Sequence, residues 1–217
     1  MLSASENRFS HLLATRPWLL ADGATGSNLF DVGLMSGDAP ELWNTEHPDR
    51  IAALHQSFVD AGADILLTNS FGGTVYRLKL HNAQGRMAEL NTLAAQIARR
   101  VADASGRTVA VAGSMGPTGE IMEPIGPLTF DEAKAAFAEQ ALALKAGGAD
   151  VLWIETMSSR EEVEAAVAGA AAADLPIVCT LSFDTNGRTM MGISPSDFSA
   201  IEQSLTPRLA ACGTNCG

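Results

Sequence analysis

Short apolar runs rich in β-branched residues alternate along this chain with longer, alanine-rich segments of helical period. A regular alternation of strand and helix is typical of repeated βα units around a parallel sheet. The pattern therefore predicts an α/β protein with six parallel strands. They are expected at residues 18–22, 64–69, 108–113, 150–155 and 176–182, and in a last run that begins near Ala211.

Apolar residues spaced three or four positions apart predict helices between these strands. Ile51, Leu54 and Phe58 mark one helix, and residues 90–101 form another. Two helix starts follow the capping-box pattern, in which a hydroxyl residue is followed three positions later by glutamate. They are Thr129 with Glu132 and Ser159 with Glu162.

A weak internal repeat places a glycine, then Ala-Asp, then an apolar strand at residues 61–67 and again at residues 147–153. A glycine accepts the left-handed conformation that ends a helix at low cost. Good loop chemistry accounts for most of this repeat.

The composition excludes several classes of protein. With 14 Lys and Arg against 25 Asp and Glu, the net charge is −11 and the pI is near 4.7, so nucleic acid and anionic membranes are poor partners. Hydrophobic residues make up 47% and charged residues 18%, as in a globular protein. Residues 1–10 are polar and no stretch approaches the ~18 apolar residues of a membrane span, so we expect a cytoplasmic protein.

Cysteine and histidine are sparse. Three cysteines are an odd number and argue for reduced thiols instead of a disulfide framework. The histidines show no metal-binding spacing, and we expect all four to be surface or hydrogen-bonded residues. They are His11, His47, His55 and His81.

Small and polar residues follow every predicted strand, at residues 22–27, 69–73, 113–117, 155–156, 182–184 and 215–217. In a closed parallel barrel these carboxyl ends face one mouth, where active sites are built. An open doubly wound sheet also binds ligands at strand ends, but the first turn lacks the G-x-G-x-x-G spacing of a dinucleotide site. The glycines therefore favour a (β/α)8 TIM-type barrel.

Such a barrel has eight strands and about 250 residues, so this chain holds about six βα units. We expect residues 1–217 to form one barrel domain that is incomplete at its C-terminus, with residues 1–16 as a helical or irregular extension. An open barrel exposes sheet edges, so association into a homo-oligomer is expected.

Three side chains at these strand ends are candidates for chemistry. Cys216 offers a thiol that binds metal or attacks a substrate, or packs as a small apolar residue. Cys212 precedes it by four residues and is expected in the core. Glu155 ends an otherwise apolar strand, so its carboxylate needs a polar surrounding. Asp22 either holds its own turn or lies beside backbone N–H groups that bind an anion.

Taken in order, these strand ends resemble the homocysteine S-methyltransferase family, which includes betaine-homocysteine methyltransferase and the homocysteine-binding domain of cobalamin-dependent methionine synthase. The resemblance runs from Leu19 to Gly217. It is carried by residues 22–27, 67–72, 112–117, 153–156, 182–188 and 213–217.

The resemblance implies a zinc site of three cysteine thiolates, with homocysteine sulfur as the fourth ligand. Cys216 matches the thiolate of the G-x-N-C segment, whereas the Cys-Cys pair that supplies the other two has no counterpart in this sequence. Coordination to Zn²⁺ delivers a thiol as a thiolate nucleophile. The homocysteine sulfur then attacks an activated methyl group and yields methionine, so Cys216 and Glu155 are the catalytic candidates.

By the same resemblance, substrate binding falls to the first turn and its neighbours. The backbone of Gly23, Ala24 and Thr25 would hold the homocysteine carboxylate. Asp22 with Glu155 would receive its ammonium, and Asn69 would line the pocket.

The methyl donor stays open among betaine, S-methylmethionine and a methyl-corrinoid partner. Betaine-using members carry a tyrosine soon after strand two, where this chain has Gly72-Gly73, although Tyr76 and Trp43 are other aromatic rings that could hold a quaternary ammonium. Two alternatives remain. One is a non-catalytic or split homocysteine-binding module, and the other is a barrel lyase or aldolase, against which the absence of a strand-end lysine argues.

Overall fold

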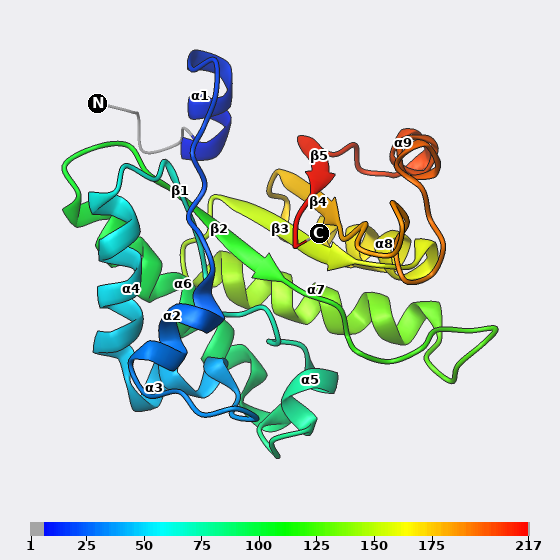
Figure 1. Ribbon diagram of the computed structural model, residues 1–217, viewed down its shortest axis with the longest axis horizontal. Coiled ribbons are helices and arrows are strands. Elements are labelled where there is room, and N and C mark those ends of the chain that lie inside the picture. Colours follow the sequence, from blue (N-terminus) through cyan, green and yellow to red (C-terminus); the bar gives the residue numbers. More distant parts are fainter. Residues whose placement is uncertain (1–6, 217) are drawn as a thin grey trace.

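The structure, a computed structural model, describes residues 7–216 and contains a five-stranded parallel sheet. Each strand lies beside the next one in the chain, in the order β1-β2-β3-β4-β5 (Figure 1). The strands are β1 (Ile65–Leu67), β2 (Ala110–Met115), β3 (Val151–Met157), β4 (Ile177–Leu181) and β5 (Ala211–Thr214). This confirms the predicted α/β class and five of the six expected strands.

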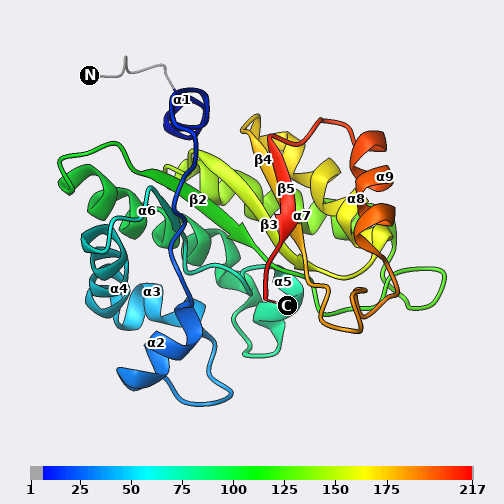
Figure 2. The same cartoon turned by 45° about the horizontal axis from the view of Figure 1, so that its top comes forward.

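The first expected strand along the chain, residues 18–22, is the exception. It is reduced to a single parallel bridge between Ala21 and Ile65. The Asp64 N–H donates to the Leu20 carbonyl at 2.7 Å, and the segment runs along β1 (Figure 2). It pairs on one side alone, and Trp18 is 70% exposed, so little holds it in a regular ladder. The assignment of these residues as a full strand was therefore wrong, although they lie parallel to β1.

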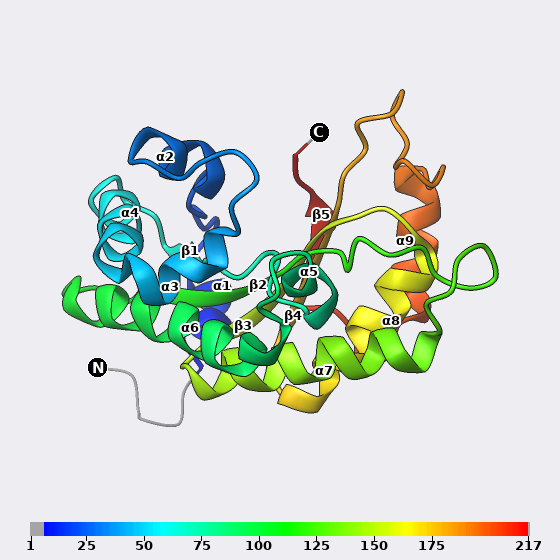
Figure 3. The ribbon, with the colours of Figure 1, turned by 90° about the horizontal axis from the view of Figure 1, so that it is seen from below.

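Helices connect the strands. The long ones are α4 (Pro48–Asp60), α6 (Met87–Ala104), α7 (Phe130–Ala146), α8 (Arg160–Ala170) and α9 (Pro195–Ser204). The short ones are α1 (Arg8–Thr15), α2 (Thr25–Asp31), α3 (Trp43–Glu46) and α5 (Val75–Lys79), with 3-10 turns at Pro40–Leu42, Gln84–Arg86 and Ala171–Ala173. Both helices predicted from periodicity are therefore confirmed as α4 and α6. Figure 3 shows α6 and α7 lying along one face of the sheet.

The sheet has two buried faces, as alternation along each strand requires. The outer face packs against the long helices, where Phe137 and Leu144 of α7 meet Leu152 and Ile154 of β3. The inner face carries smaller side chains such as Ala110 and Ala112, and α1 covers it through Phe9 and Leu12. The short helix α1 thus packs on the opposite side of the sheet from the long helices.

The internal repeat has a larger role than loop chemistry. Gly62 and Gly148 both take the left-handed conformation, with φ of +101° and +102°. The aspartate that follows each glycine accepts a hydrogen bond from the backbone of the neighbouring strand segment, because Leu20 N–H donates to Asp64 and Val111 N–H donates to Asp150. Each repeat therefore fixes the start of one strand against its neighbour.

Arginines complete both arrangements. Arg99 Nη1 lies 2.7 Å from Asp150 Oδ2, and Arg16 and Arg107 lie 3.0 Å and 3.3 Å from Asp64 Oδ1. These ion pairs are at the amino ends of the strands, opposite the predicted site. Their contribution is to stability.

The two predicted capping boxes differ. The box at Thr129 and Glu132 is formed in both directions at the start of α7. At α8, Ser159 accepts from Glu162 N–H, but the Glu162 carboxylate accepts instead from Thr118 N–H at 2.8 Å and Thr118 Oγ1 at 2.6 Å. The second box is therefore half formed, because a buried partner after β2 takes the carboxylate.

Two expectations about burial were wrong. Cys212 is exposed instead of lying in the core, because β5 is at the sheet edge and all four of its residues are exposed. His55 is fully buried in α4, and neither ring nitrogen has a hydrogen-bond partner, so it is not a satisfied or surface histidine.

None of the helices within residues 7–216 is both long enough and apolar enough to cross a membrane.

Candidate functional site

Residues from the ends of three strands meet at the carboxyl edge of the sheet. Glu155 lies near the end of β3, and its Oε2 is 3.4 Å from Nδ2 of Asn215, the residue that follows β5. The same nitrogen lies 3.4 Å from Cys216 Sγ. The carboxylate and the thiol are therefore no further apart than twice that distance, although 60 residues separate Glu155 from Asn215 in the chain.

Asp22 joins this group from the other edge of the sheet. It is half-buried, and its Oδ2 accepts the Leu67 N–H at 2.8 Å. The pKa of Asp22 is raised from 3.8 to about 7, because burial and, to a smaller extent, the negative charge of Glu155 together outweigh the lowering effect of the Leu67 N–H. Because the charge of Glu155 affects the pKa of Asp22, the two residues predicted to bind the ammonium interact electrostatically.

Glu155 is also held in partly desolvated surroundings. Burial raises the pKa of its carboxyl, and the hydrogen bond from Ser114 lowers it. No lysine, arginine or histidine within residues 7–216 forms an ion pair with Glu155 or Asp22. Two neighbouring carboxyl groups with raised pKa values and no cationic side chain favour the arrival of a positive group such as an ammonium.

Hydroxyl groups of the two preceding strand ends are connected to Glu155 by hydrogen bonds. The Ser114 hydroxyl donates to Glu155 Oε1 at 2.5 Å, while its backbone N–H donates to Thr68 Oγ1 at 3.0 Å. Ser70 Oγ lies 2.6 Å from Thr68 Oγ1 and donates to the Ser114 carbonyl at 2.7 Å. Ser114 falls among the small and polar residues expected after the third predicted strand, but its role as a partner of Glu155 was not predicted, because the sequence does not report hydrogen bonds between strands.

Asn69 is buried in the loop after β1. Its Nδ2 donates to the Pro40 carbonyl at 2.8 Å and to Asn44 Oδ1 at 3.0 Å, and Asn44 Nδ2 donates back to the Asn69 carbonyl at 2.9 Å. These contacts fix the loop against α3. Whether Asn69 also lines the pocket remains a prediction.

Further buried amides hold the next residues of this loop. Gln140 of α7 donates to the Ser70 carbonyl at 2.9 Å, and Asn91 of α6 donates to the Gly73 carbonyl at 2.8 Å. A Cβ on Gly73 would lie 2.3 Å from Asn91 Oδ1, so no larger residue fits there without a shift. The Gly72-Gly73 sequence therefore has a packing reason of its own.

The first turn lies at the start of α2. Ala24 is the N-cap and has no side-chain oxygen, so no side chain caps the first N–H groups of the helix that begins at Thr25. Gly23 is exposed, and a Cβ there would lie 3.1 Å from the Phe58 ring. The backbone of this turn is accessible, as binding of a carboxylate by Gly23, Ala24 and Thr25 requires.

Within residues 7–216, Cys216 is the one sulfur donor at this edge. Cys216 is exposed beside Asn215, and a cysteine sulfur is a preferred zinc ligand. Cys179 is buried in the outer core, where burial raises its pKa to about 12, and Cys212 pairs with it in register across β4 and β5. Residues 7–216 bring together no group of three His, Cys, Asp or Glu that could hold a metal ion. Cys216 therefore fits zinc as a single ligand, and these residues alone do not form a complete site.

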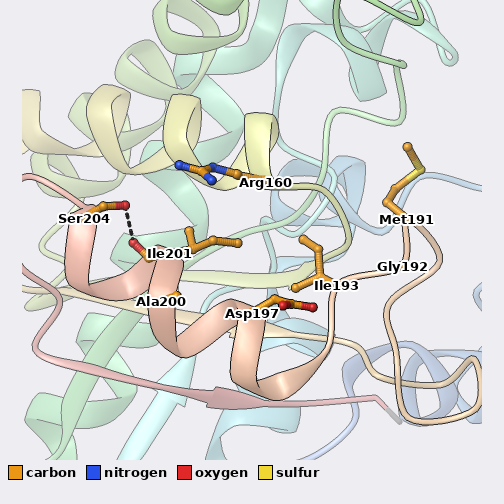
Figure 4. A pocket seen from close by; sticks show the side chains of 8 residues that line it. All are labelled: Arg160, Met191, Gly192, Ile193, Asp197, Ala200, Ile201 and Ser204. Atoms are coloured by element: carbon orange, nitrogen blue, oxygen red, sulfur yellow. Dashed lines mark hydrogen bonds between the residues drawn. The ribbon is translucent and has the colours of Figure 1, made fainter.

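Other features lie outside this edge. A cavity of about 440 Å³ lies between α8 and α9, where Arg160, Ile193 and Ile201 are among the lining residues (Figure 4). Trp43 is buried, and its ring is covered by the Arg50 guanidinium at 5.0 Å, so it is not placed to hold a donor at the strand ends. Tyr76 is half-buried in α5.

Comparison with known proteins agrees with this geometry. Residues 19–217 match the family described as homocysteine S-methyltransferase. The methionine synthases of Mycobacterium tuberculosis and Mycobacterium leprae are 31% and 30% identical to the chain over 189 residues. Each of these matches covers 80% of this chain and 16% of the relative, so the chain spans about a sixth of their length.

Solved structures give the same result. The metallated form of the homocysteine methyltransferase MmuM from Escherichia coli superposes with a TM-score of 0.80 at 26% identity, covering 97% of this chain and 78% of that one. Its oxidized form gives the same TM-score at 25% identity, and the match covers 77% of that chain. The chain therefore belongs to the homocysteine S-methyltransferase family.

Proposed function

We propose that the protein containing this chain transfers a methyl group to the sulfur of L-homocysteine and so forms methionine. The observation that carries the proposal is the meeting of Asp22, Glu155 and Cys216 at one edge of the sheet. Two carboxyl groups suit the ammonium of an amino acid, and a thiol nearby suits the metal that activates its sulfur.

The residue roles follow from chemistry and position. Asp22 and Glu155 receive the homocysteine ammonium, and the backbone of Gly23, Ala24 and Thr25 holds its carboxylate. Cys216 is one of three thiolate ligands to Zn²⁺, which when bound lowers the pKa of the homocysteine thiol. The other two ligands lie outside residues 7–216.

We further propose that the six parallel segments are six of the eight units of a (β/α)8 barrel. The likeness to MmuM, of which the chain covers about three quarters, supports this arrangement. Two more βα units would pair with the exposed edge of β5 and with residues 18–22.

The test is the effect of Cys216→Ser on the full-length gene product. We expect the variant to lose both bound zinc and methionine formation, measured by elemental analysis and by chromatography of the product. Cys212→Ser is the matched control, because Cys212 is also exposed but belongs to β5 and not to the site. Full activity of Cys216→Ser would overturn the proposal.

A second candidate is a homocysteine-binding module that needs another chain to complete its metal site. The presence of a single sulfur donor at this edge of the described chain favours it. Homocysteine binding measured by calorimetry, without methionine formation from betaine, S-methylmethionine or a methyl-corrinoid protein, would support this alternative. Turnover with one of these donors would support the enzyme and identify the donor.

A further inference from the structure

The side chain of Asn215 extends past the end of β4 and contacts the end of β3. It follows β5, yet its partners lie at the end of β3, with β4 between them. Asn215 Oδ1 accepts the Thr156 N–H at 3.0 Å, and Nδ2 donates to Thr156 Oγ1 at 2.8 Å. Because a backbone N–H only donates, the bond to Thr156 fixes which end of the amide is oxygen and which is nitrogen.

With this orientation, the Asn215 nitrogen faces both functional groups of the site. It lies 3.4 Å from Glu155 Oε2 and 3.4 Å from Cys216 Sγ. One amide group therefore contacts the carboxylate proposed to bind the substrate ammonium and the thiol proposed to bind the metal. The two groups otherwise belong to strands that do not pair with each other.

The backbone around this amide is held in an uncommon conformation. Thr156 and Cys216 have φ of +62° and +51°, in the left-handed region that a β-branched residue rarely adopts. Ser182, just after β4, donates from Oγ to the carbonyls of Asn215 and Cys216, both at 3.0 Å. Such conformations persist where surrounding contacts enforce them. The contacts of Asn215 and Ser182 are of that kind.

We propose that Asn215 is a positioning residue that fixes the Cys216 sulfur relative to the Glu155 carboxylate. The inference rests on the proposed function, because it gives both groups a role toward one substrate. Homocysteine must place its sulfur at the metal and its ammonium at the carboxyl groups at the same time. A misplacement of either group lowers the fraction of bound substrate in the reactive geometry.

Residues that orient a metal ligand typically contribute about 10- to 100-fold to metal affinity or activity. We therefore expect Asn215→Ala in the full-length protein to weaken zinc binding by about that factor. The dissociation constant is measured by competition with a chromophoric chelator, alongside the melting temperature. Asn82→Ala, which removes an exposed asparagine between α5 and α6, is the control and should leave zinc affinity unchanged.

A purely structural role gives a different result. The melting temperature of Asn215→Ala would then fall while the zinc dissociation constant stayed within twofold of the wild type, and the proposal would be overturned. Cys216→Ser separates this failure from failure of the proposed function. If Cys216→Ser still binds zinc with wild-type affinity, the assignment of the metal ligand is wrong instead.

A second variant keeps the test decisive if Asn215→Ala does not fold. Thr156→Val keeps the backbone N–H that orients the amide and removes only the hydroxyl that accepts from Nδ2. We expect it to weaken zinc binding severalfold. An unchanged dissociation constant in folded Thr156→Val would count against the proposal.

Discussion

The Ser114 hydroxyl donates a 2.5 Å hydrogen bond to Glu155 Oε1 and so joins the ends of two neighbouring strands, β2 and β3. This bond opposes the effect of burial on the carboxyl pKa. Ser114 thus keeps Glu155 closer to the ionised form that an ammonium group requires.

Ser114→Ala should therefore weaken homocysteine binding near pH 7. Without the donor the pKa of Glu155 rises further, and a hydrogen bond to a charged group contributes about 1.5–3 kcal/mol, so a loss of at least about tenfold in affinity is expected. Calorimetric titration at pH 6 and pH 8 measures it, and the deficit of the variant should be larger at the lower pH, because its Glu155 takes up a proton more readily than that of the wild type. Ser204→Ala in α9 is the control, and equal affinities for Ser114→Ala and wild type at both pH values would contradict the expectation.

Asp22 gives a pH dependence of opposite sign for stability and for binding. Its pKa is raised from 3.8 to about 7, so the folded state holds a proton that the unfolded state releases. The free energy of unfolding should therefore fall as pH rises from about 4 to 7, whereas homocysteine affinity should rise as Asp22 ionises near pH 7.

Asp22→Asn should remove both effects. At pH 8 the variant should be more stable than the wild type, by about 1–2 kcal/mol for a half-buried group, and should bind homocysteine more weakly. Urea denaturation at pH 5 and pH 8 with calorimetry at the same values provides the measurement. If the difference in the free energy of unfolding between wild type and Asp22→Asn is the same at pH 5 and pH 8, the raised pKa of Asp22 is refuted.

Arg99 offers a comparison of two ion pairs within one side chain. It pairs with Asp150 at 2.7 Å and with Asp103 at 3.1 Å, and the two aspartate side chains are 14% and 51% exposed. Asp150→Asn should lower the free energy of unfolding by about 3 kcal/mol, since it removes the more buried of the two carboxylates that pair with a largely buried cation. Asp103→Asn should cost less than about 1 kcal/mol. Equal losses in denaturant titrations would show that burial is not the deciding factor.

His55 should make the fold sensitive to acid. Burial lowers its pKa from 6.5 to about 4, so stability is lost as pH falls between these values, where the unfolded chain takes up the proton. His55→Leu should be more stable than the wild type at pH 7.5, and its advantage should grow by about 2 kcal/mol at pH 5. His81→Leu, at an exposed position, is the control for thermal melts at both pH values. An advantage of His55→Leu that does not change with pH would rule out this explanation.

Much of the fold was predictable because it depends on local patterns. The apolar runs that became β2 and β4 are buried along their whole length and β3 over most of it, and the periodic segments that became α4 and α6 bury one face. Residues 18–22 have a similar composition but a neighbour on one side only. Residues 18–22 therefore do not form a regular strand, because a strand also needs neighbours to pair with, and composition does not report these neighbours.

The candidate site was predictable in its residues but not in its connections. Asp22, Glu155 and Cys216 stood out because each is a polar or reactive group at a strand end. Ser114 and Asn215 act through hydrogen bonds across strands, and such contacts depend on register and on the direction of a side chain. His55 shows the same limit, because a buried histidine without partners has no sequence pattern of its own.

The order of the strands has a consequence for how the site is assembled. Asp22 stands before β1 at one margin of the sheet and Cys216 after β5 at the other, yet Asp22 feels the charge of Glu155, which Asn215 links to the Cys216 sulfur. A homocysteine molecule bound as proposed would therefore bridge the two margins of the sheet. Its binding would then stabilise the whole sheet against any state in which one of the strands at either margin has detached.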